Sequence, residues 1–147
     1  MNDQLCSYLY KKYPKILTSN LPIDCSDGWF FLLNCFLEGV QSHIDLERAY
    51  VTDKDPIPQV VALQVKEKFG GLRFYFTGGD SNIRVLAQFV EHLSHYICEE
   101  SGDFSEKVGI VTKGWIKTLT SEQASSKNWQ SAYDEELLQI FEKLRST

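Results

Sequence analysis

Residues 60–76 carry the pattern that most restricts the fold of this chain. The stretch VVALQVKEKFGGLRFYF contains two runs of alternating side chains that meet at the pair Gly70-Gly71. Successive side chains of a strand point to opposite faces, and paired glycines tolerate the backbone angles that a tight turn needs. The stretch therefore predicts a β-hairpin, but it names no chemistry.

The alternation gives the predicted hairpin an apolar face and a polar face. The apolar face holds Val61, Leu63, Val65, Phe69, Leu72, Phe74 and Phe76. The polar face holds Gln64, Lys66, Lys68, Arg73, Tyr75 and Thr77. Antiparallel sheets often keep one face in water, so we interpret the polar set as a solvated surface. The alternative is a nucleic-acid platform, on which cations follow the backbone and the tyrosine stacks on a base.

Composition indicates one acidic domain with a packed core. The chain has 147 residues, 43% of them hydrophobic, and a formal net charge of −5 from 15 basic and 20 acidic residues. This charge argues against a general nucleic-acid binder and suits a basic partner, although it is also ordinary for a soluble protein.

The sequence contains no signal for membrane insertion or export. Its apolar runs fall short of the about 20 residues that span a bilayer, and the first residues lack the order of a signal peptide. We therefore expect a cytoplasmic protein without a membrane partner. Its four cysteines form no Cys-x-x-Cys pair, so we expect free thiols: Cys6, Cys25, Cys35 and Cys98.

The remaining elements follow from helical spacing, caps and breakers. We expect helices over 3–13, over 27–43 with Asp27 as cap, over 81–99 with Asp80 or Ser81 as cap, and over 131–145. Residues 45–59 are predicted to form a charged loop, and 108–112 and 115–119 to form strands. The predicted fold is a single α+β domain over residues 1–147, with a small, mainly antiparallel sheet covered by helices.

Three stretches together resemble a family of small phage and prophage proteins with no assigned activity. They are DGWF at 27–30, QVKEKFGGLRFY at 64–75 and GWIKTL at 114–119, and the resemblance extends over about residues 8–124. In its usual form this family implies a zinc ribbon after the long helix, with a Cys-x-x-Cys knuckle and a Cys-x-x-His knuckle.

This chain departs from that pattern at the metal ligands. The four knuckle positions hold Cys98, Ser101, Thr120 and Gln123, so one thiol remains of the set that a structural zinc ion needs. We expect no cofactor and a degenerate ribbon over about 98–124, kept in shape by hydrogen bonds and covered by the helix at 131–145. Recruitment of a metal by His92, His95 and Cys98 is the alternative.

No intact catalytic motif is present in the sequence. The histidines stand in no motif with serine or cysteine, and no glycine pair continues into a phosphate-loop pattern. Cys98 follows His95 by three residues, which permits a thiolate–imidazole contact, but we interpret this cysteine as a remnant of the ribbon. We therefore expect no enzyme activity and no small-molecule substrate, while a site assembled from dispersed residues stays open.

The sequence best fits an immunity or antitoxin protein that binds a cognate, basic bacterial toxin, such as a nuclease. Acidic residues would occupy the toxin's substrate groove, and aromatic residues would anchor the contact. The candidate partner-binding residues are Asp45, Glu47, Asp53, Asp55, Glu99, Glu100, Asp103, Glu106, Trp129 and Tyr133. The alternative is a nucleic-acid-associated accessory protein derived from a zinc-ribbon module. It is supported by the polar hairpin face with Lys66, Lys68, Arg73 and Tyr75.

Overall fold

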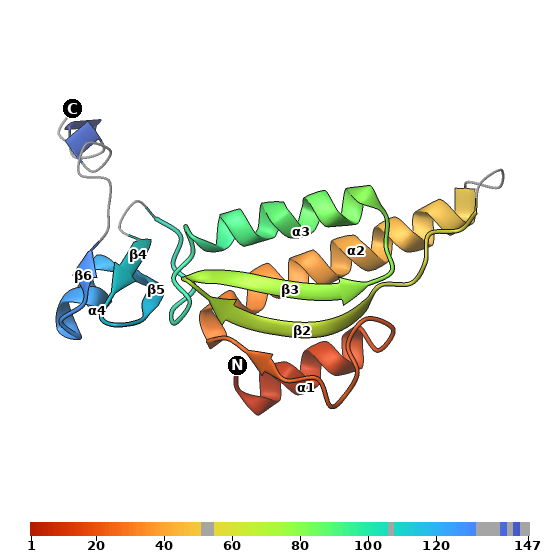
Figure 1. The fold of residues 1–147 in the computed structure, drawn as a ribbon, viewed down its shortest axis with the longest axis horizontal. Coiled ribbons are helices and arrows are strands. Elements are labelled where there is room, and N and C mark those ends of the chain that lie inside the picture. The colour runs from red at the N-terminus through yellow and green to blue at the C-terminus, as the bar shows by residue number, and fades with distance from the viewer. Residues whose placement is uncertain (51–54, 106–107, 132–138, 141–142, 145–147) are drawn as a thin grey trace.

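Helices and two small sheets build the chain in an α+β arrangement, as the sequence predicts (Figure 1). The computed structural model describes residues 1–50, 55–105, 108–131, 139–140 and 143–144. The elements are α1 (Asp3–Lys12), β1 (Ile23–Asp24), the 3-10 helix η1 (Asp27–Trp29), α2 (Phe30–Tyr50), β2 (Val61–Lys68), β3 (Gly71–Thr77), α3 (Ser81–Ser94), β4 (Val108–Thr112), β5 (Ile116–Thr120), α4 (Ser121–Ser126) and β6 (Gln130–Ser131).

The predicted hairpin forms the centre of the first sheet, in the order β1-β2-β3. Strands β2 and β3 are antiparallel, and the short β1 pairs with β2 in parallel. The turn residues are Phe69 and Gly70, with φ of 55° and 76°, and not the predicted glycine pair. Two positive φ angles are the requirement of a type I′ turn, whose twist matches that of the strands. Gly71 instead begins β3 opposite Lys68.

A bulge in β2 overturns part of the predicted face assignment. The register shifts between Ala62 and Gln64, so Ala62 and Val65 are both buried while Leu63 is 60% exposed. A bulge inserts an extra residue, which reverses the alternation on one side of it. Phe69 is also exposed, because it lies in the turn. Leu72 is buried, as predicted.

Helix α2 contributes six buried side chains to the core. Its buried side chains repeat at helical spacing and include Phe36, whose ring contacts that of Phe74 at 4.9 Å between centroids. Figure 1 shows α2 and α3 running alongside the hairpin. Asp27 does not cap this helix as predicted, because its carboxylate accepts hydrogen bonds from the backbone and side chain of Asn2 instead. The prediction of a loop over 45–59 is wrong for residues 45–50, since α2 continues to Tyr50.

Helices α1 and α3 begin at the predicted residues, and the predicted cap Asp80 is confirmed for α3. Asn2 caps α1, and Asp80 caps α3 by accepting from the backbone N–H of Ile83 at 3.0 Å. Helix α3 ends at Ser94, earlier than predicted, because the chain then extends and Ile97 pairs with Phe104 in an isolated bridge. No helix within the described ranges is long and apolar enough to cross a bilayer.

The second sheet has the order β5-β4-β6. Strands β4 and β5 confirm the prediction, whereas β6 (Gln130–Ser131) ends at the residue where a helix is predicted to begin. We call residues 98–105 and 108–131 the ribbon, and residues 1–50 and 55–97 the body. Of the predicted helix at 131–145, residues 139–140 and 143–144 are described and helical, and Ile140 and Leu144 are exposed rather than packed on the ribbon. Tyr133, Leu137 and Phe141 lie outside the described residues.

Candidate interaction surfaces and the ribbon junction

The four positions that the resemblance compares with zinc ligands lie together in the ribbon. The Cys98 thiol donates to Oε1 of Gln123 at 2.8 Å, and the backbone N–H of Ser101 points to the Cys98 sulfur at 3.5 Å. Thr120 and Gln123 form the capping box that starts α4. Hydrogen bonds thus connect these loops, except that the Ser101 hydroxyl donates to Asp103 instead.

A metal-ligand cluster is not formed by the residues that the structure describes. Nowhere in these ranges do three histidine, cysteine or acidic side chains gather closely enough to hold an ion. In the alternative set, His92 bonds to the Gln88 carbonyl on the surface of α3, while Cys98 is buried against Gln123. These two side chains therefore do not form the predicted alternative site.

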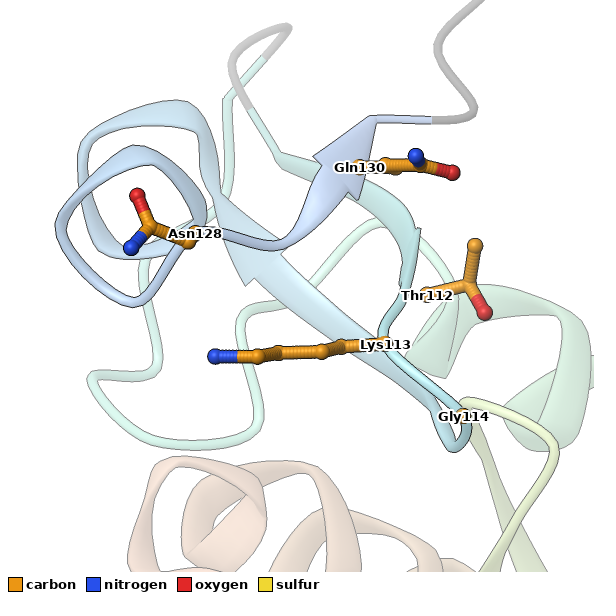
Figure 2. Close-up of a pocket in the computed structure, with 5 residues that line it drawn as sticks. All are labelled: Thr112, Lys113, Gly114, Asn128 and Gln130. Carbon is orange, nitrogen blue, oxygen red and sulfur yellow. The ribbon is translucent and has the colours of Figure 1, made fainter.

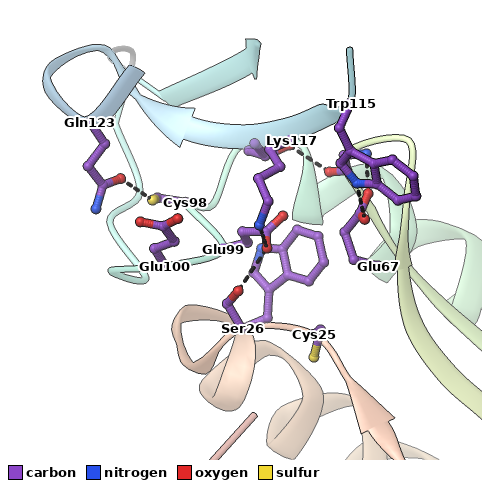
Figure 3. A network of polar contacts seen from close by, with 12 residues as sticks. Cys25, Ser26, Glu67, Cys98, Glu99, Glu100, Trp115, Lys117 and Gln123 are labelled. Carbon is purple, nitrogen blue, oxygen red and sulfur yellow. Dashed lines mark hydrogen bonds and ion pairs between the residues drawn. The ribbon is translucent and has the colours of Figure 1, made fainter. Parts of the chain in front are cut away.

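Glu99 joins the ribbon to the body (Figure 3). It is 1% exposed, and its Oε1 accepts from Nζ of Lys117 at 2.7 Å and from Oγ of Ser26 at 2.8 Å. Its second carboxylate oxygen, Oε2, is buried without a hydrogen-bond partner in the described part of the chain. A buried carboxylate depends on partners such as Lys117 and Ser26. Glu99 is therefore a structural residue, and it is not available on the surface to a partner protein.

The backbone makes further contacts across this junction. Gly28 donates to the Glu99 carbonyl at 2.9 Å across the junction. On the body side of it, the Trp29 indole N–H donates to the Ile97 carbonyl at 2.8 Å. A Cβ at position 28 would collide with the backbone of Cys98, Glu99 and Gly102. The glycine of the DGWF stretch is therefore required by close approach of two chain segments.

The ribbon also contacts the tip of the hairpin. The Thr118 hydroxyl donates to the Gly70 carbonyl at 2.6 Å, and the Trp115 indole donates to Oε2 of Glu67 at 3.0 Å (Figure 3). The other oxygen of Glu67 accepts from the Gly70 N–H. Most of the Trp115 ring nevertheless remains exposed, so it combines a fixed orientation with an open apolar surface.

The acidic candidates that the structure describes form two stretches, one at the C-terminal end of α2 and one in the ribbon, near the start of that helix. Gly28 contacts Glu99 at the start of α2, and a helix rises about 1.5 Å per residue, which puts Asp45 about 25 Å away. Asp45 and Asp55 are exposed, and Glu47 is half-buried. One compact contact surface therefore does not include both stretches.

The remaining candidates differ in their exposure. Asp103 is exposed, and Glu100 pairs with Lys127 at 2.5 Å. Trp129 is half-buried and packs on the apolar cluster of the ribbon, which makes it a core aromatic rather than a surface anchor. Asp53, Glu106 and Tyr133 lie outside the described residues.

Exposed apolar side chains are the surface feature that the sequence reasoning missed. The most exposed are Phe31 and Tyr50, at 76% and 80%. Helix α3 also exposes two apolar side chains on its outer side, Val85 and Phe89, and the exposed Tyr96 follows just after its end. The spacing of four residues between Val85 and Phe89 was visible in the sequence, beside the buried stripe that begins at Ile83.

The polar face of the hairpin only partly persists as a cationic surface. Lys66 lies 5.8 Å from the centroid of the exposed Tyr75 ring. Arg73, in contrast, forms an ion pair with Glu91 of α3 and is half-buried. The pairing removes one cation from the predicted nucleic-acid platform.

His95 packs beside this ion pair. A Cβ on Gly71 would lie 2.8 Å from Nε2 of His95 and 3.0 Å from Nη1 of Arg73, so the two side chains fill the same space. Burial, and then the Arg73 charge, lower the pKa of His95 below its ordinary value. The ring thus favours its neutral form next to the guanidinium.

A shallow polar depression of about 270 Å³ lies on the ribbon (Figure 2). Its lining comprises Thr112, Lys113, Gly114, Asn128 and Gln130, and the Lys113 ammonium donates to the Lys127 carbonyl. Figure 2 shows no carboxylate, imidazole or thiol among these side chains. The depression therefore offers hydrogen-bonding groups but no acid–base pair for catalysis.

Comparison of the chain with protein-family models, curated proteins and solved structures gave no match.

Proposed function

We propose that this chain is a non-enzymatic binding protein, most specifically an immunity or antitoxin protein that neutralises a bacterial toxin by direct contact. The observation that carries the proposal is the number of large apolar side chains held in water, including Phe31, Tyr50, Phe89 and Trp115. Exposed apolar patches mark contact surfaces, and aromatic residues contribute much of the energy of such contacts.

Charge supports a basic partner. The formal net charge is −5, and Asp45, Asp55 and Asp103 are exposed. Opposite fields accelerate encounter and disfavour wrong partners. Nucleases that bind the phosphate backbone present basic surfaces, so a toxin of this kind is the partner class that fits best.

Nucleic acid is the weaker alternative. Lys66, Lys68 and Tyr75 could still contact a phosphate backbone and a base, but Arg73 is engaged by Glu91. If the chain bound DNA or RNA through this face, retention on the polymer would fall steeply with salt. Retention on DNA or RNA at low salt would therefore favour the alternative over the toxin inhibitor.

Co-purification tests the proposed function. The chain, carrying an affinity tag, is produced together with the product of each adjacent gene, and growth is measured with and without it. We expect one product to be toxic alone, to be neutralised by the chain and to purify with it. If no adjacent product binds and no toxicity is relieved, the proposal is wrong.

A further inference from the structure

The last two turns of α2 extend beyond the core. The buried side chains of α2 end at Ile44, and each residue from Asp45 to Tyr50 is exposed or half-buried. Figure 1 shows this end of α2 reaching past the start of α3. Short helical segments gain little stability without packing. We call residues 45–50 the overhang, and its outer face has no partner within the described part of the chain.

The overhang exposes two large apolar side chains on one side. Leu46 is 57% exposed and Tyr50 is 80% exposed. Residues four apart on a helix are neighbours, so the two side chains form a continuous apolar surface. An amphipathic helix end of this kind fits into a groove of another protein.

The overhang and the chain that follows it are acidic. Asp45 and Glu47 lie in the last two turns of α2, and the exposed Asp55 lies in the following segment. The C-terminal end of a helix carries partial negative charge, so these carboxylates add to a field that already has the same sign. Arg48 offsets one charge, although its guanidinium donates to the Ile57 carbonyl at 3.0 Å.

We infer that the overhang is the docking site for a basic protein partner, with Leu46 and Tyr50 entering an apolar groove and Asp45, Glu47 and Asp55 pairing with lysines or arginines around it. This inference rests on the proposed function and assigns its partner to one end of α2. The exposed pair Val85 and Phe89 on α3 is a poorer candidate, because the exposed polar residues next to Phe89 on the helix, Gln88 and His92, supply no negative charge.

Matched variants test this assignment in the full-length chain. Tyr50→Ser is compared with Tyr96→Ser, and Asp45→Lys with Asp24→Lys in β1. All four side chains are exposed, so melting temperatures should stay close to that of the unchanged chain. The probes are the purified products of the adjacent genes, whose dissociation constants are measured at low and moderate salt.

We expect Tyr50→Ser and Asp45→Lys each to raise the dissociation constant for the captured product at least about tenfold. Both control variants should bind it with a dissociation constant within about threefold of that of the unchanged chain. Asp45→Lys should also reduce the salt dependence of the association rate. If the chain binds but the overhang variants bind equally well, the docking site is wrong while the proposed function stands. If the unchanged chain captures no product, the proposed function is wrong and the docking site falls with it.

Discussion

The body buries large side chains such as Trp29, Phe36 and Leu37, whereas the buried cluster of the ribbon consists of Cys98, Val108, Val111, Leu119 and Ala124. The ribbon is also shorter than the about 40 residues below which a domain usually needs a disulfide, a metal or a partner. Its contacts with the body are mainly polar, through Glu99, Trp115 and Thr118. We infer that the body supplies the stability on which the ribbon depends.

Removal of a core side chain from the body should have the largest effect. Phe36→Ala leaves a cavity beneath the Phe74 ring and should lower the free energy of unfolding by about 3–5 kcal/mol. Because the ribbon depends on the body, it should not outlast the body: in a urea series, hydrogen exchange of β4 should show the ribbon lost no later than the unfolding of the body followed by circular dichroism. A ribbon that stays protected after the body unfolds would contradict the comparison.

Breaking the junction pair should open the ribbon while the body stays folded. Lys117→Met leaves the Glu99 carboxylate buried with only Ser26, and we expect about 2–3 kcal/mol less protection of β4 and β5 amides, since Lys117 is itself partly exposed. Protection of β2 and β3 should remain.

Lys113→Met is the matched control for this variant. The Lys113 ammonium is exposed and bonds to one carbonyl, so its loss should change stability by no more than about 0.5 kcal/mol. Equal effects of the two variants would show that the Glu99–Lys117 pair does not hold the ribbon in place.

Loss of the α4 cap should have a smaller effect that is again confined to the ribbon. Thr120→Ala removes the hydroxyl that accepts from the Gln123 N–H and should cost about 1 kcal/mol. Hydrogen exchange of the α4 and β5 amides measures this loss, with Thr112→Ala on the exposed part of β4 as control. A change that reached the hairpin amides equally would argue for one cooperative unit.

Acid should weaken the body slightly through His95. Burial, followed by Arg73 and His92, lowers the pKa of this group in the folded chain, while Glu91 opposes the shift. The unfolded chain therefore binds the proton first, so this contribution is present above about pH 6.5 and is lost as the pH falls. His95→Gln should flatten the decline of the urea midpoint between about pH 7 and pH 5, with His92→Gln as the control. An unchanged slope in His95→Gln would assign the acid sensitivity elsewhere.

Local signals predicted the elements, and long-range contacts decided the surfaces. Capping by Asp80 and the β-branched run at 108–112 depend on neighbours in the sequence, so they could be read directly. Burial of Glu99 depends on Ser26 and Lys117, which are distant in the sequence, and no local pattern announces it. The bulge near Leu63 likewise follows from the pairing of β2 with β3, so alternation alone assigned that residue to the wrong face.

Thiol labelling across a urea series tests the dependence of the ribbon on the body most directly. Cys98 in the ribbon is 0% exposed and Cys25 in the body is 7% exposed, and burial raises the pKa of Cys25 to about 12. Static exposure predicts that Cys98 is labelled last, whereas opening of the ribbon predicts that it is labelled before Cys25, at lower urea and with a weaker urea dependence. Labelling of both thiols in one transition with the same urea dependence would contradict our account.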